Sequence, residues 1–437
     1  MEESGLMYLL WSDLVGVTRT RGVPLKNFND HIETGLGWAC AGQALTPFQN
    51  IVENPWGPMD EVRQIPDLAS KFIIPASHEN RAIHAVICNS QLSPEKEWDV
   101  CVRSFCQNAI RDLKAETGMD LIAAFELEFL LEAADFVPEQ PFSFGAARIQ
   151  HSFLSALEES LTIAGVKPET LEPEYGVGQY EISIAPSGAL NAADAAIISR
   201  EVTREVARRH EIRASFSPKP TMEHVGNGCH IHFSLVDSKG CNVTSAAGGV
   251  LGLSEMAQKF CAGILVHMDA LLSITAPSPI SYNRLGPNNW SAGYNCIGQQ
   301  NREAAIRVIP GISNDTSKAD KAFHFEFRAS DSTASPYLSI GVLVRAGLEG
   351  IQNNLVLPNV VKVDPSEMSA EERSDAKIKP LPESLEIALE ALEKDKVVRS
   401  WLPKELYGTY RNIKRWEIDN SKSTARDQLF RMYRKAY

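Results

Sequence analysis

Acidic and apolar side chains alternate in the stretch Phe125-Glu126-Leu127-Glu128-Phe129. In a β-strand, residues i and i+2 point to the same face, so the two glutamates would share one face and the three apolar residues the other. A carboxylate that is buried beside a core is costly unless it is paired with a cation. The stretch therefore predicts a strand with a core on one face and a cation on the other.

Acids and histidines recur in three later stretches, two of which have the same i, i+2 spacing. Their side chains are Glu174 and Glu181, His230 and His232, and Glu326 beside Arg328. A half-exposed strand with ion pairs at its edge would explain any one pair, but not all of them together. The carboxylates outnumber the neighbouring basic residues, and carboxylate oxygens suit magnesium or manganese better than structural zinc. The pattern predicts a site for divalent metal ions.

The composition is that of a well-packed globular protein. The chain has 437 residues, 44% of them hydrophobic, and a formal net charge of -12; its length allows roughly two to three domains. The acidic charge argues against non-specific binding to nucleic acid, which depends on basic surface. The eight cysteines show no metal-binding spacing and are expected to be reduced core thiols. No signal peptide is recognisable and no run reaches the ~20 apolar residues of a membrane span, so we expect a cytoplasmic protein without a membrane partner.

Two regions of the chain differ in pattern, and we expect domains over residues 1–103 and 104–437. The first region mixes short apolar runs with turn-rich connections, which predicts a small strand-rich domain. The second region contains longer segments with helical periodicity. We expect helices at 105–117, ended by Gly118, and at 192–210, 257–274, 381–392 and 424–435, and a solvated loop at 363–380.

Five motifs, spread over nearly the whole chain, resemble those of the glutamine synthetase superfamily and follow the same order. They lie at Gly178-Gln179-Tyr180-Glu181, 226–232, 281–285, 301–307 and 326–338. The resemblance implies an α+β fold with an N-terminal β-grasp domain and a catalytic domain in which helices surround a curved antiparallel sheet. It also implies a homo-oligomer of stacked rings whose active sites lie between subunits.

The resemblance further implies an ATP-dependent ligase that uses two or more Mg²⁺ or Mn²⁺ ions in each site. Such an enzyme phosphorylates the γ-carboxylate of L-glutamate and lets an amine displace the phosphate. Divalent ions neutralise the charge that develops during phosphoryl transfer. By motif, the first ion would be held by Glu128, Glu174 and Glu181, and the second by Glu126, His230 and Glu326.

The remaining motif residues are implied to bind the substrates. Glutamate would be contacted by Arg284, Arg328 and Gly226; a guanidinium can hold a carboxylate through two parallel hydrogen bonds. The ATP side would comprise His232, Ser234, Arg302, Arg307 and Lys321. The catalytic residues would be Arg302, Arg284 and Glu128.

The segment Pro287-Asn288-Asn289-Trp290-Ser291-Ala292 departs from the ammonia-using members of the superfamily. Those members typically have a glutamate at the position of Trp290, which attracts ammonium and removes its proton. An indole cannot act as a base, but it offers apolar area, stacking and cation-π attraction to an organic amine. We therefore predict a γ-glutamylamide synthetase that binds a small aromatic or alkyl amine at Trp290.

Two alternatives remain open from the sequence. One is an ammonia-dependent glutamine synthetase with a rearranged amine site. The other is a non-catalytic relative, which would be expected to have lost metal ligands. A further departure is His324, which stands where an arginine often contacts ATP.

Overall fold

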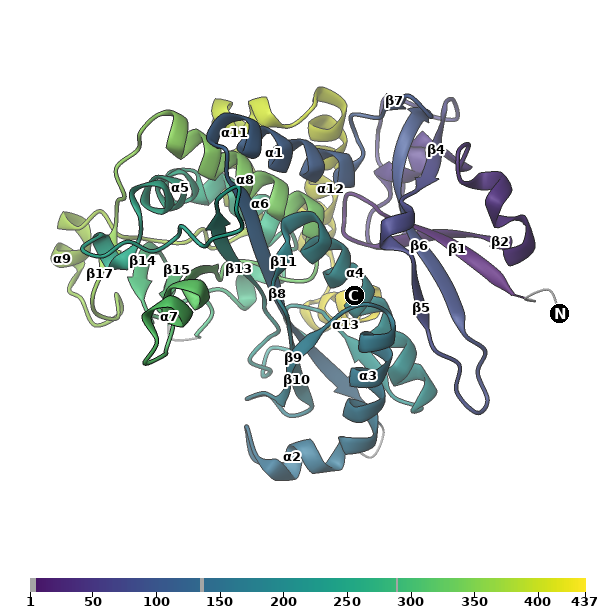
Figure 1. Cartoon of the computed structure of the whole chain (residues 1–437), viewed down its shortest axis with the longest axis horizontal. Helices are drawn as coiled ribbons and strands as arrows, with labels where there is room; N and C mark the ends of the chain where they lie inside the picture. The colour runs from purple at the N-terminus through teal and green to yellow at the C-terminus, as the bar shows by residue number, and fades with distance from the viewer. Residues whose placement is uncertain (1–4, 134–136, 288–289) are drawn as a thin grey trace.

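The computed structural model describes residues 5–133, 137–287 and 290–437. Its N-terminal part is a β-sheet, drawn in purple at one end of the molecule (Figure 1). The strands lie in the order β2-β1-β6-β4-β3, with β5 and β7 also paired to β6. Their bounds are β1 Leu6–Ser12, β2 Thr18–Pro24, β3 Leu36–Ala39, β4 Glu61–Pro66, β5 Phe72–Ile74, β6 Ile83–Ser93 and β7 Lys96–Glu97. This sheet confirms the predicted N-terminal β domain.

A larger sheet follows, with the strand order β17-β14-β15-β16-β13-β8-β10-β9. Strands β11 and β12 also pair with β8, and β18 pairs with β14. The pairing is antiparallel except where β14 runs parallel to β15 and β17. The bounds are β8 Asp120–Glu132, β9 Pro168–Pro173, β10 Gln179–Ile184, β11 Ser187–Gly188, β12 Arg213–Ser215, β13 Cys229–Val236, β14 Tyr294–Gln299, β15 Ala304–Ile309, β16 His324–Phe327, β17 Val360–Val361 and β18 Lys379–Pro380.

Strand β8 is the long central strand of the larger sheet, and it contains the alternating stretch. Phe125, Leu127 and Phe129 are buried, whereas Glu126 and Glu128 are only partly buried. The apolar face of β8 packs against α4, while the glutamates lie on the opposite face. The strand predicted from the alternation is therefore confirmed.

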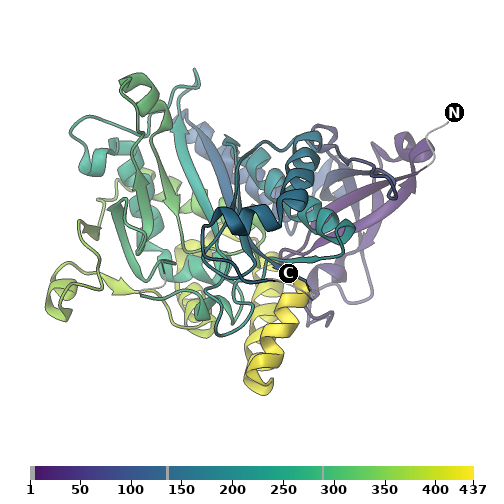
Figure 2. The same cartoon turned by 90° about the horizontal axis from the view of Figure 1, so that it is seen from below.

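Helices pack in layers over the sheet. Helix α8 contacts both α1 and α5, and Figure 1 shows these helices together along one side of the sheet. Figure 2 shows the C-terminal helices, in yellow, projecting from the body of the molecule. The bounds are α1 Val102–Thr117, α2 Phe144–Ile149, α3 His151–Ile163, α4 Ala189–Arg209, α5 Glu255–Val266, α6 Met268–Thr275, α7 Thr316–Ala322, α8 Pro336–Gln352, α9 Ala370–Asp375, α10 Leu385–Lys394, α11 Lys396–Trp401, α12 Lys404–Ser423 and α13 Arg426–Ala436.

Most predicted helices are present, with two differences. Helix α1 ends where expected, because Gly118 adopts φ +72° and stops it. The expected single helix over 257–274 is instead α5 and α6, bent by 78° at His267. The expected loop at 363–380 contains the short helix α9, which Ser369 and Glu372 begin with a reciprocal capping box.

No single helix among the described residues is long and apolar enough to cross a membrane, and α5 with α6 would reach that length only as a bent pair. All eight cysteines are described. None forms a disulfide, and only Cys241 is exposed.

Candidate active site

Cross-strand pairing brings the predicted acids and histidines together. The residues that face each other are His230 and Glu126, His232 and Glu326, and Glu181 and Glu128. Opposed residues on antiparallel strands have Cβ atoms about 4.5–5.5 Å apart. Four adjacent strands, β16, β13, β8 and β10, therefore present these side chains on one face.

The two histidines lie against Glu126 and Glu326. His232 Nε2 is 3.0 Å from Glu126 Oε1, and His230 Nδ1 is 3.2 Å from Glu126 Oε2. His230 Nδ1 is also 3.4 Å from Glu326 Oε1. On its other side, His230 Nε2 is 4.0 Å from Glu128 Oε1. Each ring thus joins carboxylates that come from different strands.

Two sets of side chains are close enough to share a metal ion. They are Glu126, His232 and Glu326, and Glu126, Glu181 and His230; in each set the ligand atoms lie within 4.8 Å of one another. From the sequence, His232 is expected on the ATP side, and the two predicted ligand sets are Glu128, Glu174 and Glu181, and Glu126, His230 and Glu326. Within the described residues, neither sequence-derived set forms such a cluster by itself, so that grouping remains a prediction.

The carboxylates near the histidines are held in their charged form. Burial raises the pKa of Glu126, but His232 and His230 outweigh it and leave that pKa well below its usual range. Burial likewise opposes ionisation of Glu326, and Arg328 with His232 lowers its pKa overall. These side chains are therefore negatively charged at neutral pH.

The carboxylates on β10 and in the loop before it have raised pKa values, which favour their neutral form. Burial, followed by the charges of Glu126 and Glu128, raises the pKa of Glu181 to about 10. Burial and the charge of Glu128 raise the pKa of Glu174 to about 7. This half of the cluster has too little positive charge nearby to balance its acids.

The donor chemistry fits divalent cations. The cluster offers mainly carboxylate oxygens, which Mg²⁺ and Mn²⁺ prefer. The Nε2 atom of His230 is buried and has no hydrogen-bond partner among the described residues. A cation beside Glu174 and Glu181 would also supply the positive charge that those acids lack. The residues present thus suit the metal ions that the sequence predicted.

Two arginines contact Glu326, which is fully buried. Arg307 and Arg328 each pair with one of its oxygens. Arg328 also donates from Nε to the Arg302 carbonyl at 3.1 Å and from Nη2 to the Trp290 carbonyl at 2.8 Å. Three nitrogen atoms of Arg328 are therefore bonded to the protein, and its predicted contact with glutamate remains a prediction.

Arg284 and two glycines form the wall beside the cluster. Arg284 is buried and donates from Nη2 to the Ser330 carbonyl at 2.7 Å. A Cβ on Gly226, which has φ +104°, would lie 2.8 Å from Arg284 Cγ. A Cβ on Gly228 would lie 2.8 Å from His230 Nε2, 3.0 Å from Glu128 Oε1 and 3.1 Å from Arg284 Nη1. The absence of side chains at 226 and 228 thus leaves room where Arg284 meets the cluster.

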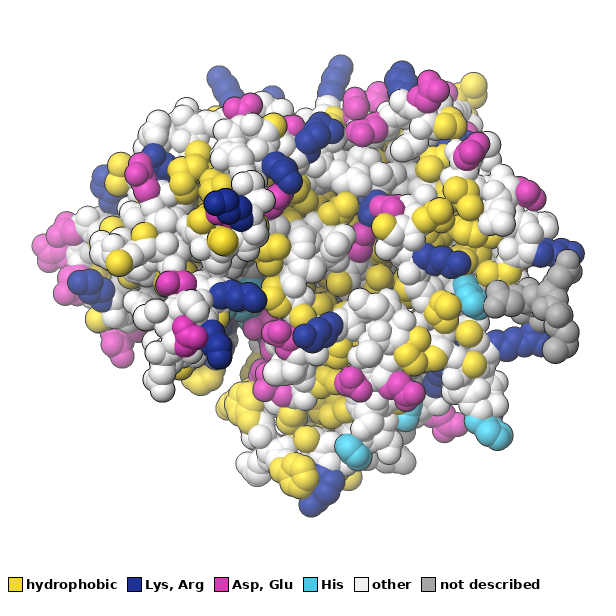
Figure 3. Space-filling view, viewed as in Figure 1, with side chains coloured by type: hydrophobic (Ala, Val, Ile, Leu, Met, Phe, Trp, Pro, Cys, Tyr) yellow, Lys and Arg dark blue, Asp and Glu magenta, His cyan; other side chains and the backbone are white. Residues whose placement is uncertain are grey.

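A cavity of about 600 Å³ opens on the other side of the cluster. Its walls include Glu126, His232, Ser234, Lys321 and His324. The volume falls within the ~300–1,000 Å³ of small-molecule and cofactor sites. Figure 3 shows acidic side chains at the edge of a hollow between the α7 and α2 regions. Three of the residues predicted to bind ATP, His232, Ser234 and Lys321, therefore line one cavity next to the carboxylates. The other two, Arg302 and Arg307, are outside that lining.

Trp290 stands at the surface with 66% of its side chain exposed. Of the segment predicted to bind the amine, Asn288 and Asn289 lie outside the described residues. The side chains of Ser291 and Ala292 are buried. The indole is thus turned outward from this segment.

Two residues that the sequence analysis did not single out support the site. Gln179 Nε2 donates to Glu128 Oε2 at 2.8 Å and to the Gly226 carbonyl at 2.6 Å, so it links the cluster to the glycine wall. His224 Nδ1 accepts the Gly226 N–H at 3.0 Å. Gln179 could have been selected from its motif, whereas His224 lies in a stretch without periodicity and carried no signal.

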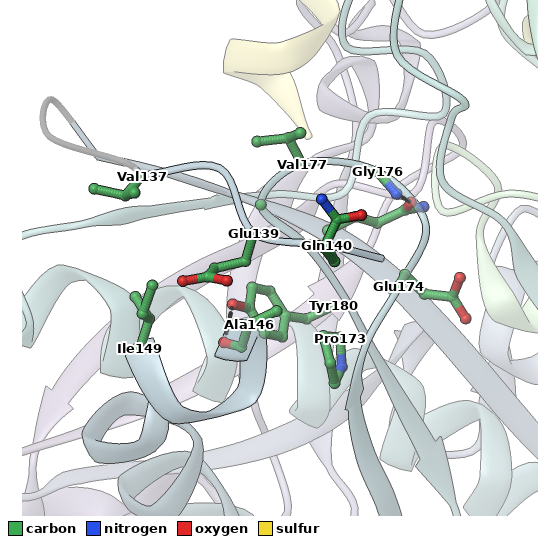
Figure 4. Close-up of a pocket in the computed structure, with 12 residues that line it drawn as sticks. Val137, Glu139, Gln140, Ala146, Ile149, Pro173, Glu174, Gly176, Val177 and Tyr180 are labelled. Carbon is green, nitrogen blue, oxygen red and sulfur yellow. Dashed lines mark hydrogen bonds between the residues drawn. The ribbon is translucent and has the colours of Figure 1, made fainter. Parts of the chain in front are cut away.

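A second hollow lies behind the loop that carries Glu174 (Figure 4). It is lined by Val137, Ile149 and Val177 together with Glu139 and other residues of the loop. The Tyr180 hydroxyl donates to the Ala146 carbonyl at 2.9 Å and closes one side. In Figure 4 the Glu174 carboxylate points away from Val137 and Ile149, but Glu174 and Gln179 also line this hollow, so the hollow adjoins the cluster.

Comparison with known families gives two matches that together span almost the whole chain. Residues 1–94 match the model of the glutamine synthetase N-terminal domain, and residues 99–433 match that of the glutamine synthetase catalytic domain.

Individual relatives carry different names. A gamma-glutamylpolyamine synthetase from Streptomyces coelicolor is 29% identical over 404 residues, covering 90% of this chain and 85% of its own length. A glutamine synthetase from Methanocaldococcus jannaschii is 29% identical over 435 residues, covering 95% and 92%.

Solved structures agree with the fold. A structure described as a novel glutamine synthase homolog has a TM-score of 0.92 at 35% identity and covers 100% of this chain and 99% of its own. The ADP complex of GmaS has a TM-score of 0.83 at 25% identity and covers 96% and 94%.

Proposed function

The chain belongs to the glutamine synthetase family, whose members are ATP-dependent ligases, and we propose that it is a glutamate-amine ligase. The reaction joins the γ-carboxylate of L-glutamate to a small organic amine through a γ-glutamyl phosphate. ATP is consumed, and the products are a γ-glutamylamide, ADP and phosphate. The observation that carries this proposal is the outward-facing Trp290, which stands at the position where the family resemblance implies an acid in ammonia-using members.

Each group of side chains has a role in the proposal. Bound Mg²⁺ or Mn²⁺ would neutralise phosphate charge in the loose transition state of phosphoryl transfer. The holders would be Glu126, Glu128, Glu174, Glu181, His230 and Glu326, and His232 is a further candidate because it lies within one ligand set. The cavity beside His232, Ser234 and Lys321 would take ATP.

The arginines orient the two reacting groups in the proposal. Arg284, with Gly226 beside it, would hold the α-carboxylate of glutamate. Arg302 lies near Glu174, and its charge partly opposes the burial and the Glu128 charge that raise the pKa of Glu174. Arg302 would contact the phosphate that leaves. Arg307 would act on the ATP side, and Arg328 would hold the segment of Trp290 next to glutamate. A near-attack geometry of this kind lowers the barrier by pre-ordering the reactants.

An ammonia-dependent glutamine synthetase is the second candidate, because relatives with that name are as similar as the polyamine ligase. The complete set of candidate metal ligands argues against a non-catalytic relative. The two candidates differ only in the amine half of the reaction.

Phosphate release with glutamate, ATP and one amine at a time separates these candidates. The panel is aniline, alkylamines, polyamines and ammonium. We expect at least one organic amine to give a kcat/KM higher than that for ammonium. Turnover with ammonium alone would rule out the amine-ligase proposal and support the second candidate.

A substitution at Trp290 tests the amine site. We expect Trp290→Ala to raise the KM for the amine and to change the KM for ATP much less, because the indole would contact only the amine. Equal changes in both KM values would mean that Trp290 has a packing role.

We also propose stacked homo-oligomeric rings with active sites between subunits, cytoplasmic location, and a domain division between residues 103 and 104. The measured mass of the native particle tests the first of these. A monomer with full activity would contradict the proposed intersubunit site.

A further inference from the structure

Both backbone polar groups of Trp290 are bonded to side chains next to the larger sheet, those of Glu303 directly before β15 and of Arg328 directly after β16. Its N–H donates to Glu303 Oε1 at 2.9 Å, and its carbonyl accepts from Arg328 Nη2 at 2.8 Å. Trp290 has φ +51°, a left-handed conformation that is unfavourable for a residue with a side chain. These two contacts hold the backbone in this conformation.

Glu303 contacts the same segment at a second point. Its carbonyl accepts the Gly293 N–H at 3.1 Å. Its own N–H donates to Asn301 Oδ1 at 3.0 Å, and it lies directly before β15. Glu303 is only 4% exposed, so a buried residue at the edge of the sheet fixes both ends of the stretch from 290 to 293.

The side chains in this stretch are fixed to different degrees. Ser291 is 3% exposed and donates from Oγ to the Arg284 carbonyl at 2.8 Å, and Ala292 is fully buried. Trp290 is the residue of this stretch whose side chain faces solvent. The backbone bonds of Trp290 to Glu303 and Arg328 therefore set the direction in which the indole leaves the backbone.

We propose that Glu303 is a positioning residue that fixes the Trp290 indole and thereby sets which amine the site accepts. This inference rests on the proposed amine-binding role of Trp290. A charged acceptor forms a stronger hydrogen bond than a neutral one, and a carboxylate of this length reaches the Trp290 N–H. Glu303→Ala removes the acceptor, Glu303→Asp shortens the side chain that carries it, and Glu303→Gln keeps the length of the side chain but removes its charge.

Hydrogen–deuterium exchange tests the contact without any substrate. In Glu303→Ala we expect the Trp290 amide to exchange at least about tenfold faster than in the wild type, because an amide that loses its hydrogen bond opens more readily. Glu303→Gln should lie between the two. The matched control Glu383→Ala removes an exposed carboxylate and should leave this amide unchanged. Unchanged exchange in Glu303→Ala would overturn the proposal.

Steady-state kinetics tests the effect on amine choice. We expect Glu303→Ala and Glu303→Asp to raise the KM for the amine about tenfold, with less than a threefold change in the KM for ATP and for glutamate. Glu303→Gln should recover most of the loss. Faster exchange with equal changes in all three KM values would assign Glu303 a structural role only and overturn the positioning role.

The two proposals fail in different ways. If the wild type uses ammonium alone, the amine-ligase function is wrong. In that case, a higher KM for ammonium together with faster exchange of the Trp290 amide in Glu303→Ala would support the positioning role of Glu303. An unchanged KM for ammonium would overturn it.

Discussion

Glu326 and Glu181 show how charge is distributed among single residues of the cluster. Glu326 is balanced by two arginines and two histidines. Glu181 faces other acids, and the largest effects on its pKa, burial and Glu126, both favour its neutral form. One half of the cluster is therefore neutralised by the protein, and the other half depends on added cations. This asymmetry predicts that metal binding is felt mostly by the acids of β10 and the loop before it.

Glu128 acts on both halves, since its charge raises the pKa of Glu174 and Glu181 and its carboxylate lies 4.0 Å from His230 Nε2. We expect Glu128→Gln to lower turnover at least about 100-fold with every amine, because it removes a carboxylate from the proposed metal site. Phosphate release and the midpoint of Mg²⁺ activation measure the effect. The control Glu139→Gln changes an exposed glutamate that is not one of the candidate metal ligands and should retain activity. Retained turnover in Glu128→Gln would contradict the role of Glu128.

His224 predicts a dependence of stability on pH. Burial, assisted by the charge of Lys219, lowers its pKa from 6.5 to about 4. As the pH falls, His224 therefore takes up a proton at a higher pH in the unfolded chain than in the folded protein. The contribution of His224 is full above pH 6.5 and is lost as the pH falls through that value toward 4.

Urea unfolding at several pH values measures this effect. Between pH 7 and 4 the wild type should lose up to about 3 kcal/mol more stability than His224→Gln. The control His151→Gln, at an exposed position, should follow the wild type. Parallel curves for the wild type and His224→Gln would contradict the prediction.

At the scale of elements, close helix packing depends on glycine. A Cβ on Gly263 in α5 would lie 1.9 Å from the Ala346 carbonyl oxygen in α8, and one on Gly350 would lie 2.1 Å from the Lys259 carbonyl oxygen. The two backbones therefore touch without intervening side chains. This contact fixes the distance between the helices that cover the sheet.

A pair of Gly→Ala substitutions tests the packing. Gly263→Ala should destabilise the protein by at least about 2 kcal/mol, because the methyl group meets backbone that cannot move freely. Gly408→Ala, in α12, meets nothing within 4 Å and should stabilise by about 0.5–1 kcal/mol, since alanine restricts the unfolded chain. Chemical unfolding measures the change in the free energy of unfolding for both variants. A change of the same sign in both would contradict the prediction.

Local sequence patterns were sufficient for elements that depend on local chemistry. The end of α1 follows from Gly118, and the face of β8 follows from the alternation around Glu126. The bend at His267 did not follow, because both sides of it are apolar and helical in pattern. It is fixed by tertiary contacts: His267 Nδ1 lies 2.6 Å from Asp395, far along the chain.

The candidate site shows the same division. The acids and histidines could be predicted from their spacing and from the family resemblance. The distances between these side chains could not, because they depend on the register between strands, which places His232 opposite Glu326. The contact between Glu303 and Trp290 joins two segments of irregular backbone, and a single sequence contains no signal for it.

Across the whole molecule, a buried arginine joins the two parts of the chain. Arg103, at the start of α1, pairs with Asp194 of α4 at 2.7 Å and with Asp67 of the N-terminal part at 2.8 Å. Tyr337 also donates its hydroxyl to Asp194. The network fixes the N-terminal sheet against the helices behind the site.

Removing one member should leave the arginine charge poorly balanced. We expect Asp194→Asn to lower the free energy of unfolding by about 3 kcal/mol, because breaking a buried ion pair leaves an uncompensated charge. Asp112→Asn changes a carboxylate in partly exposed ion pairs and should cost less than about 1 kcal/mol. Urea unfolding measures both, and similar losses would contradict the role of the network.

The alternation in β8 also governs which changes of length the chain can tolerate over evolution. Deleting one residue between Asp120 and Phe125 would reverse the direction of every following side chain in the strand. The glutamates would then enter the helix-packed core, and the phenylalanines would face the cluster. Substitutions that keep the apolar face and the glutamates can therefore accumulate in β8, whereas we expect insertions and deletions in connections such as the segment before α9. Variation in length among descendants of this chain should map the parts that do not touch the sheet.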